Sequence, residues 1–344
     1  MDRINIGIVG LHFGRYIVEE EIANGPGTPH FKLAAVCSQE PDKTNAMAEK
    51  FGCRAYHDLD ELLSDKSIPC IGLFTGPVGR ANLIRKVIRA GKDVMTTKPF
   101  ELDPMAARNV LEEAAQLGRV VHLNSPSPLL SADLQQMVAW QEAFDLGQPI
   151  GCRADVWVSY REKPDGSWYD DPALCPVPPI FRLGIYLIND LVRLFGPAER
   201  VAVTSSRIFT GRPTADNGQL SIAFKSGALA NIFGSFCVLD GEHYKNALTL
   251  NYERGTIYRN AGALPVDLEP GSSHLQCVQM KDRKKTIHEA VVRGSSGTYQ
   301  WDAFARAVRK EPLATDVTVD QIVNGIAIIQ AMYKSEKSGM VEPV

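Results

Sequence analysis

The fold is decided by residues 6–14, which read Ile6-Gly7-Ile8-Val9-Gly10-Leu11-His12-Phe13-Gly14. A short apolar strand ends there in a glycine turn, and a helix is expected over residues 14–23. Backbone N–H groups at the start of such a helix can bind a dinucleotide pyrophosphate. The usual pattern is G-x-G-x-x-G. Here His12 stands where the second glycine is expected, and Gly14 comes one residue early. The same turn occurs in α/β proteins that bind no nucleotide, so its place before alternating strands and helices is what favours a nucleotide site.

A second stretch reads Asp93-Val94-Met95-Thr96-Thr97-Lys98-Pro99-Phe100. It is another apolar strand, and it ends at a lysine that Pro99 keeps from continuing into a helix. In an open parallel sheet both strand ends open on the same ligand-binding crevice. Lys98 is therefore expected close to the reactive end of a bound nicotinamide. The alternative is a surface lysine whose stem lies along apolar residues.

The composition excludes several classes of protein. The chain has 344 residues, of which 44% are hydrophobic and 22% charged, and its formal net charge is −3. Two globular domains are expected, with no nucleic-acid or membrane partner. Seven widely spaced cysteines without a C-x-x-C pair indicate reduced thiols in a cytoplasmic protein. The first strand begins so early that no signal peptide is expected.

The first 125 residues alternate strands with helices, which indicates βαβ units and a doubly wound parallel sheet, the Rossmann arrangement. Strands are expected at 4–9, 31–37, 70–75, 94–97 and 120–123, and helices at 14–23, 41–51, 59–64, 78–90 and 103–117. After residue 125 the pattern changes to neighbouring strands separated by turn pairs such as Ser226-Gly227, which favours antiparallel pairing. Strands are expected there at 150–160, 201–209, 220–224, 228–236, 247–251, 256–259 and 275–280, and helices at 132–144, 181–195, 299–309 and 319–338. The domains are expected at 1–125 and 126–344, with the last helix returning to the first.

The end of the second strand bears on the choice of nucleotide. An acidic residue in place of Ser38 would bind the adenosine ribose and select NAD. Ser38 cannot repel a 2′-phosphate, and Lys43 follows one helical turn later. NADP is therefore slightly favoured over NAD, although Ser38 also reads as a merely polar strand end.

The helix expected at 181–195 has one apolar side and one polar side. The polar side carries Arg182, Tyr186, Asn189, Asp190 and Arg193. Because an ammonium group favours the anionic form of a nearby phenol, Tyr186 is a candidate acid/base. The alternative is a packing tyrosine on a solvated face.

Arginines at 182 and 80 suggest a substrate with a carboxylate or phosphate group, since a guanidinium binds such groups bidentately. The alternative is a structural ion pair of Arg182 with Asp190 or Asp155. Tyr160 and Trp168 lie in a loop rich in aromatic and acidic residues, which suits either a sugar ring, a lid or a dimer contact. The histidines lack ligand spacing, so no metal site is predicted.

Together these residues resemble the Gfo/Idh/MocA family, which includes glucose–fructose oxidoreductase and inositol dehydrogenases. The likeness runs nearly end to end and rests on the Gly10 turn, on residues 90–94 leading to Thr97-Lys98-Pro99, on residues 182–189 and on the closing segment 335–340. It implies a dinucleotide-binding Rossmann domain followed by an α+β domain with a large, mostly antiparallel open sheet.

The resemblance also assigns roles to single residues. Lys98 matches the lysine that holds and polarises the reacting hydroxyl, and Tyr186 matches an acid/base position that is histidine in many members. Asn189 matches a polar residue one turn later, and Asn124 the asparagine after the last Rossmann strand. The sequence departs from the family pattern at four positions: Thr97 replaces a glutamate, Arg182 an aspartate, Arg80 a histidine and His12 a glycine.

The resulting prediction is an NAD(P)-dependent dehydrogenase or reductase acting on a secondary alcohol or ketone of a sugar, sugar acid or cyclic polyol. Two alternatives are a non-catalytic NAD(P)-binding sensor or regulatory subunit and a nucleotide-dependent glycoside-cleaving enzyme. By analogy with the family, a homodimer or homotetramer is expected. The predicted catalytic residues are Lys98 and Tyr186, and the predicted substrate-binding residues are Asn189, Arg182, Asp190, Tyr160 and Trp168. The predicted cofactor-binding residues are Gly10, Leu11, His12, Phe13, Gly14, Ser38, Lys43, Thr75, Arg80, Thr97, Lys98 and Asn124.

Overall fold

The computed structural model describes residues 2–241, 244–265, 267–281 and 283–344. The chain forms two compact units, of which the first contains Met1–Leu129 and Tyr299–Val319 and the second contains Leu130–Thr298 and Asp320–Val344. The boundary after residue 129 lies close to the expected one, whereas the return of residues 299–319 to the first unit was not expected. No helix in the described ranges is both long and apolar enough to cross a membrane.

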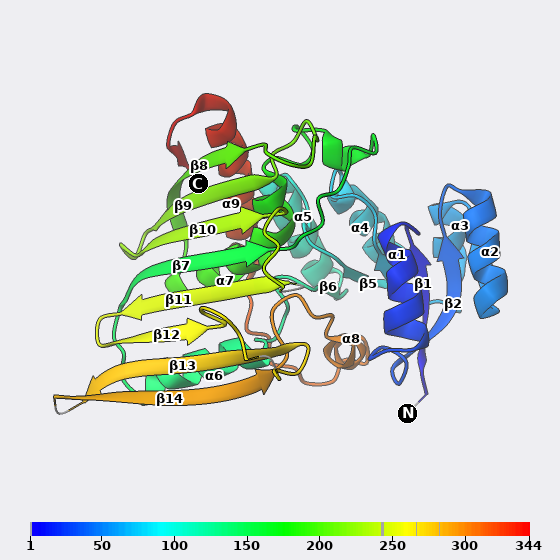
Figure 1. The fold of residues 1–344 in the computed structure, drawn as a ribbon. Coiled ribbons are helices and arrows are strands. Elements are labelled where there is room, and N and C mark those ends of the chain that lie inside the picture. Colours follow the sequence, from blue (N-terminus) through cyan, green and yellow to red (C-terminus); the bar gives the residue numbers. More distant parts are fainter. Residues whose placement is uncertain (1, 242–243, 266, 282) are drawn as a thin grey trace. The chain divides into compact units, whose positions relative to one another are not determined.

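The first unit is built on a six-stranded parallel sheet with the order β3-β2-β1-β4-β5-β6 (Figure 1). The chain order reverses between β1 and β4, and ligands of open α/β sheets bind outside the carboxyl ends of the strands at such a point. The strands are short and largely buried, as expected of a parallel sheet. They are β1 (Ile4–Val9), β2 (Phe31–Cys37), β3 (Arg54–Tyr56), β4 (Cys70–Leu73), β5 (Asp93–Thr96) and β6 (Val121–Leu123).

Capping residues determine where several helices of the first unit begin and end. Asp58 and Asp103 accept N–H groups from the first turns of α3 and α5, and Gly52 ends α2 in the left-handed conformation. The helix expected at 14–23 begins as α1 and continues as a π-helix, η1. The helices are α1 (Phe13–Tyr16), η1 (Ile17–Ala23), α2 (Pro41–Phe51), α3 (Leu59–Ser64), α4 (Arg80–Arg89), α5 (Pro104–Gln116) and α8 (Trp301–Val308).

Helix α8 belongs to the first unit because its aromatic residues pack on β2. The ring centroid of Phe31 lies 5.5 Å from that of Trp301 and 5.3 Å from that of Phe304. The last helix, α9 (Val319–Ser338), lies almost entirely in the second unit, where the hydroxyl of Ser335 accepts the N–H of Val203 at 3.1 Å. Helix α8 is thus part of the first unit, and α9 from Asp320 onward is part of the second.

The second unit contains a nine-stranded sheet with the order β14-β13-β12-β11-β7-β10-β9-β8-β15. Only the pair β7–β10 is parallel among the pairings of its described residues, so the sheet is mostly antiparallel, as the resemblance implies. The strands are β7 (Pro149–Trp157), β8 (Ala198–Ser206), β9 (Asn217–Phe224), β10 (Leu229–Ser235), β11 (Lys245–Tyr252), β12 (Gly255–Arg259), β13 (Ser272–Lys281), β14 (Lys284–Arg293) and β15 (Glu342–Pro343).

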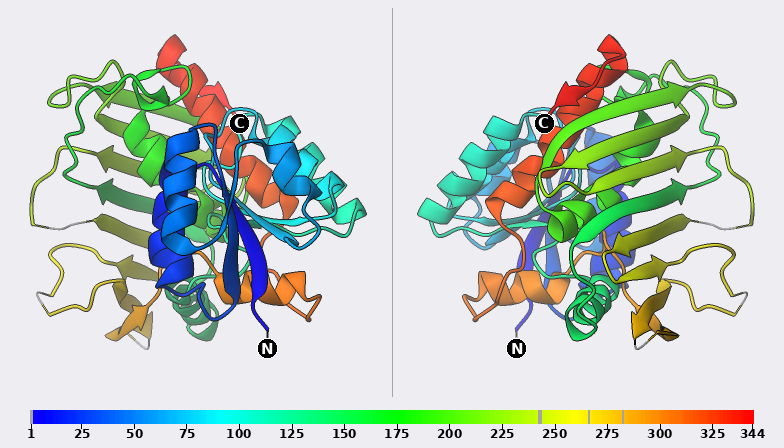
Figure 2. Two further views of the ribbon diagram at one scale, coloured as in Figure 1. Left: turned by 90° about the vertical axis from the view of Figure 1, so that its right-hand side faces the viewer. Right: turned by 90° about the vertical axis from the view of Figure 1, so that its left-hand side faces the viewer.

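The helices of the second unit lie over one face of this sheet, and the views of Figure 2 show the opposite face without a helix in the described part of the chain. Ile150, Leu229 and Val341 are exposed and line a groove of 560 Å³ together with residues of β7, β9 and β10. The segment expected as one helix at 181–195 begins as a π-helix, η3, and continues as α7. The helices are α6 (Ala132–Ala143), η2 (Trp168–Asp170), η3 (Pro179–Gly184), α7 (Ile185–Phe195) and α9.

One strand prediction is displaced for a visible reason. The strand expected at 201–209 is β8, which ends at residue 206, and Ile208 and Phe209 are exposed beyond it. The carboxylate of Asp216 accepts the N–H groups of Ile208, Phe209 and Thr210 at 2.7–3.0 Å. A single side chain thus replaces the neighbouring strand as hydrogen-bond partner, and the chain leaves the sheet.

Candidate active site

The glycine turn after β1 is closely enclosed by main chain. Gly10 has a φ of +88°, and a Cβ there would lie 2.9 Å from the carbonyl oxygen of Phe74. Its N–H donates to the carbonyl of Cys37 at 2.9 Å, and the N–H of Gly14 donates back to the Gly10 carbonyl at 3.1 Å. Because a side chain at position 10 has no room, the turn stays bare at the switch point. This geometry fits the close approach of a pyrophosphate.

The other residues of the turn differ in exposure. The side chain of Leu11 is buried in the core, so only its backbone is available to a nucleotide. His12 and Phe13 are exposed at the start of α1. Replacing glycine by histidine at position 12 therefore adds a side chain on the surface. This side chain does not fill the space inside the turn.

A carboxylate that the sequence analysis missed stands beside this turn. Oε1 of Glu40 lies 3.1 Å from Nε2 of His12, and Oε2 lies 2.7 Å from Nζ of Lys43. The hydrogen bond from Lys43 lowers the pKa of Glu40. The hydroxyl of Ser38 accepts the N–H of Glu40 at 3.2 Å and lies 2.7 Å from the hydroxyl of Thr44. Ser38 and Lys43 were the two residues that slightly favoured NADP, and in the structure Lys43 is paired with Glu40.

At the carboxyl end of β5, other elements hold the main chain around Lys98. The N–H of Lys98 donates to Oδ1 of Asn124, which follows β6, at 2.9 Å. The hydroxyl of Thr97 accepts that of Tyr299, which precedes α8, at 2.8 Å. Tyr299 is buried, and burial raises the pKa of its hydroxyl. Thr97, the residue that replaces the family's glutamate, thus has a partner within its own unit.

Arg80 is the first residue of α4 and is 1% exposed. Its Nη1 donates to the carbonyls of Thr97 and Pro99 at 2.5 Å each, and its Nη2 donates to the carbonyl of Thr75. Burial lowers the pKa of Arg80 to about 10. Its guanidinium is therefore bound to main chain and is not displayed to an anionic substrate, which contradicts that part of the hypothesis.

In the second unit, part of the polar side of α7 is buried. Asn189 and Asp190 are 5% and 3% exposed. Oδ2 of Asp190 accepts Nη1 of Arg259 at 3.2 Å, and Oδ1 accepts the hydroxyl of Ser296 at 2.6 Å. Burial raises the pKa of Asp190 to about 6. The helix therefore does not present a simple solvated face, and Asp190 is in a structural network.

Arg259 is the centre of this network. Its Nη1 also lies 2.9 Å from Oδ2 of Asp133 on α6, and its Nη2 donates to Oδ1 of Asn246 on β11 at 2.6 Å. Burial acts to lower the pKa of Arg259, but Asp133 and Asp190 more than offset it and raise that pKa. The network ties two helices to two strands.

Glycines pack against two of the three candidate residues of α7. A Cβ at Gly297 would lie 2.5 Å from Cε1 of Tyr186, and a Cβ at Gly325 would lie 2.3 Å from Oδ1 of Asn189. Gly297 also has a φ of +99°, which a residue with a side chain rarely adopts. Both candidate side chains are therefore positioned by direct contact with main chain of later segments.

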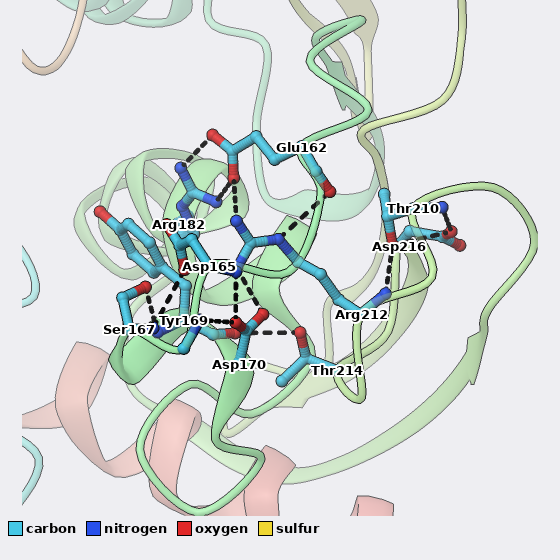
Figure 3. Close-up of polar contacts among 11 residues, drawn as sticks. Glu162, Asp165, Ser167, Tyr169, Asp170, Arg182, Thr210, Arg212, Thr214 and Asp216 are labelled. Carbon is cyan, nitrogen blue, oxygen red and sulfur yellow. Dashed lines mark hydrogen bonds and ion pairs between the residues drawn. The ribbon is translucent and has the colours of Figure 1, made fainter.

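Arg182 lies in a network of charges drawn in Figure 3. Its Nη1 and Nη2 form a bidentate pair with Glu162, at 2.6 and 3.0 Å, and its Cζ lies 3.9 Å from the ring centroid of Tyr169. Nη1 of Arg212 lies 2.6 Å from Oδ1 of Asp170. Arg182 thus pairs with Glu162, a partner that the sequence did not suggest, and its fork is already bound to a carboxylate.

The two aromatic candidates lie beside this network. The ring of Trp168 lies 4.1 Å from that of Tyr169, and the ring of Tyr160 stacks on Phe236 at 6.1 Å. Phe236 in turn lies 4.9 Å from the guanidinium of Arg182. The structure thus brings Tyr160, Trp168 and Arg182 into one cluster, while Tyr186, Asn189 and Asp190 share α7. Lys98 and the predicted cofactor residues belong to the first unit. Among the described residues, no group of three or more His, Cys, Asp or Glu could hold a metal ion.

Comparison with protein-family models matches both parts of the chain. Residues 4–125 match the oxidoreductase family with an NAD-binding Rossmann fold, and residues 134–258 match the GFO/IDH/MocA C-terminal domain. The chain belongs to the GFO/IDH/MocA family. The resemblance stated from the sequence is confirmed. The prediction that the first part of the chain forms a Rossmann domain that binds NAD or NADP is confirmed as well.

Two of the similar proteins are named as a reductase and a dehydrogenase of sugars. A dTDP-3,4-didehydro-2,6-dideoxy-alpha-D-glucose 3-reductase of Streptomyces violaceoruber is 30% identical over 97 residues, 28% of each chain. A D-apiose dehydrogenase of Paraburkholderia graminis is 22% identical over 223 residues, 60% of this chain and 54% of the relative. The matched segments span 28–60% of the length of such relatives.

Solved structures share the complete fold. GenD2 from gentamicin A biosynthesis, in complex with NAD, superimposes with a TM-score of 0.75 at 19% identity and covers 100% of this chain and 97% of its own. A variant of a 3-ketoreductase of Actinomadura kijaniata, with TDP-benzene and NADP, gives a TM-score of 0.70 at 15% identity and covers 97% and 98%. At these identities the likeness establishes the fold alone.

Proposed function

We propose that this protein is an NAD(P)-dependent oxidoreductase that transfers hydride between the nicotinamide and a secondary alcohol or ketone of a sugar, sugar acid or cyclic polyol. The observation that carries the proposal is the main chain around Lys98, held at the carboxyl end of β5 by Arg80 and Asn124. If Lys98 were a surface lysine without a function, there would be no reason for buried side chains to fix the main chain before and after it.

Each part of the candidate site would have a separate role in nucleotide binding or in the reaction. The turn from Gly10 to Gly14 would bind the pyrophosphate through backbone N–H groups, and the nicotinamide supplies the hydride chemistry when bound. Lys98 would orient and polarise the reacting oxygen as a hydrogen-bond donor. Tyr186 would exchange the proton of that oxygen. Gly297 would orient Tyr186, because its bare main chain lies against the phenol ring.

The substrate class is supported by the named sugar enzymes and by the aromatic cluster of Tyr160 and Trp168. Glu162 neutralises Arg182, which weakens the case for a carboxylate- or phosphate-bearing substrate. We therefore expect Arg182→Ala to loosen the loop that holds Glu162 and to leave the preference between neutral and acidic sugars unchanged. A selective loss of acidic substrates in Arg182→Ala would restore the earlier hypothesis.

For the nucleotide, we propose that Glu40 favours NAD. Its carboxylate stands beside the glycine turn, where it can accept a ribose hydroxyl and would repel a 2′-phosphate. We expect Glu40→Gln to move the ratio of the NADP and NAD dissociation constants toward NADP by about tenfold at low salt. Glu49→Gln, an exposed carboxylate further along α2, is the matched control. Equal ratios in the parent and Glu40→Gln would remove this role.

The experiment that tests the function is turnover. Purified protein with NAD or NADP is mixed with a panel of aldoses, ketoses, sugar acids and inositols, and the absorbance of reduced nicotinamide is followed beside Lys98→Ala. Turnover that is lost in Lys98→Ala supports the proposal. Tight nucleotide binding with no turnover would favour a sensor or regulatory subunit, and release of sugar from a glycoside without net reduction would favour the glycoside-cleaving alternative.

We further propose a homodimer or homotetramer that forms through the open face of the nine-stranded sheet. Exposed Ile150, Leu229 and Val341, which line the groove of 560 Å³, support this proposal. Sedimentation of Leu229→Asp tests it, since a charge on a buried interface should shift the protein toward monomer. A cytoplasmic location is proposed from the seven cysteines of the sequence, which are widely spaced and include no C-x-x-C pair.

A further inference from the structure

We infer that Arg80 is a positioning residue for Lys98, because its guanidinium fixes the main chain on both sides of that lysine. The inference rests on the proposed function, since it gives Arg80 a role in aiming the amine that polarises the substrate oxygen. Arg80 itself touches neither substrate nor nucleotide in this proposal.

The geometry is that of a fork inserted between two strand ends. One nitrogen, Nη1, donates to the carbonyls of Thr97 and Pro99, the residues directly before and after Lys98, at 2.5 Å each. The other, Nη2, donates to the carbonyl of Thr75, which follows β4. A rigid planar guanidinium thereby ties the ends of the adjacent strands β4 and β5 together.

No other side chain at this position offers the same set of donors. The histidine that the family resemblance places at position 80 has at most two N–H groups, which point in different directions. A lysine has a single nitrogen at the end of a flexible stem, so its donors cannot reach three separated carbonyls as a planar fork does. The arginine at position 80 therefore supplies a set of main-chain contacts that a histidine there could not supply.

The charge of Arg80 makes a purely space-filling role implausible. Burying a guanidinium is costly, and here Nη1 and Nη2 donate to main-chain carbonyls while the buried Nε has no hydrogen-bond partner among the described residues. The buried carboxylate of Glu101 acts on Arg80 only from a distance, because its oxygens accept the N–H groups of Ala81 and Leu102 at 2.9 and 2.7 Å. An apolar residue would fill the same volume without this cost, so the hydrogen bonds to main chain are what the arginine contributes.

Arg80 and Thr97, two of the residues that differ from the family pattern, are part of the same hydrogen-bond network. Thr97 receives Arg80 on its carbonyl and Tyr299 on its hydroxyl, while Lys98 donates its N–H to Asn124. The segment is thus held by α4, by the loop after β6 and by the segment before α8. Since a misplacement of about 1 Å can cost about 100-fold in rate, loosening one of these holds is expected to lower turnover strongly.

The test compares Arg80→Met with Arg85→Met on the best substrate found in the panel. Arg85 lies on the same helix and pairs on the surface with Glu113 at 2.8 Å. We expect kcat to fall by about 100-fold in Arg80→Met, with KM and the nucleotide Kd close to the parent values, and Arg85→Met to behave as the parent. Arg80→Lys keeps the charge and should lose less than Arg80→Met.

A double-mutant cycle separates positioning from general damage. If Arg80 acts through Lys98, then Arg80→Met lowers the residual rate of Lys98→Ala no further. Additive losses would overturn the inference, as would an unchanged kcat in Arg80→Met while Lys98→Ala is inactive. Full activity of Lys98→Ala would instead overturn the proposed function.

A second measurement needs no substrate and no active enzyme. The rate of acetylation of Lys98 by acetic anhydride is read by peptide mass spectrometry, with Lys86 of α4 as the internal standard. We expect the ratio of the two rates to change about threefold or more in Arg80→Met and Arg80→Lys, and not in Arg85→Met, because a freed main chain alters the surroundings of the amine. An unchanged ratio in both Arg80 variants overturns the inference even if no substrate has been found.

Discussion

Arg80 in the first unit and Arg259 in the second are both 1% exposed, yet their charges are balanced in opposite ways. Arg80 donates to three main-chain carbonyls, whereas Arg259 lies against the carboxylates of Asp133 and Asp190. Carbonyl groups are neutral dipoles, so removing Arg80 would cost only the hydrogen bonds that it donates to them. Removing Arg259 would instead leave the carboxylates of Asp133 and Asp190 buried without an opposite charge. The same residue type thus shapes a backbone in one unit and holds helices and strands together in the other.

The strongest test of this difference is Arg259→Met. Removing one partner of a buried ion network leaves the others charged in a medium that solvates them poorly, which costs about 3–5 kcal/mol. We expect the free energy of unfolding, measured by urea titration, to fall by about that amount. Arg254→Met is the control, because Arg254 pairs with Asp145 on the surface. A loss no larger than that of the control would show that the network does not stabilise the unit.

The pH dependence of stability sharpens the role of Asp190, whose folded-state pKa is raised to about 6. Its unfolded pKa is about 3.9, so between these values the native state holds the proton more tightly than the unfolded state. Stability should therefore fall as the pH rises from about 4 to 6 and change no further from this group above that range.

The variant Asp190→Asn removes this titration and keeps the size of the side chain. We expect the difference in unfolding free energy between the parent and the variant to decline by about 2–3 kcal/mol from pH 4 to pH 7. A difference that rises with pH would mean that the Arg259 charge, and not burial, controls Asp190.

A smaller loss of stability is expected for Arg80→Met. Its carbonyl partners are left without donors, but they are neutral, and the cost of burying a charge disappears with the arginine. We expect a loss of about 1–3 kcal/mol by urea titration, less than for Arg259→Met. If the two losses were equal, the contrast between dipole and ion partners would not hold.

The smallest effect is expected for Arg85→Met, which breaks a surface pair. Its free energy of unfolding should remain within about 1 kcal/mol of the parent value. A larger loss would show that α4 is sensitive to any change, and the Arg80 variants would then have to be compared at equal stability.

Local patterns predicted most elements of the fold. The strands at 4–9 and 31–37 and the helices at 41–51, 59–64 and 319–338 lie where the sequence places them, because apolar periodicity and capping residues act over a few positions. The prediction for residues 201–209 was displaced because the hydrogen bonds to Asp216 are not visible in the pattern of the strand itself.

The contacts of the candidate site residues could not be predicted from the same patterns. Glu40 has the only local signal among the missed residues, its spacing of three from Lys43. The carboxylate partners of Arg259 are 126 and 69 residues away along the chain, and Tyr299 is 202 residues from Thr97. The structure also gave Arg80 and Arg182 different partners from those expected.

By itself, the sequence determined the alternation of strands and helices in the first unit, the glycine turn at residue 10 and the place of Lys98 at a strand end, because each depends on backbone preferences of neighbouring residues. Only the tertiary structure decided which arginine faces a carbonyl and which faces a carboxylate. Those partners come from segments that are far apart in the sequence and are brought together by packing. The energy of a buried charge depends on the groups packed around it and not on its neighbours in the sequence.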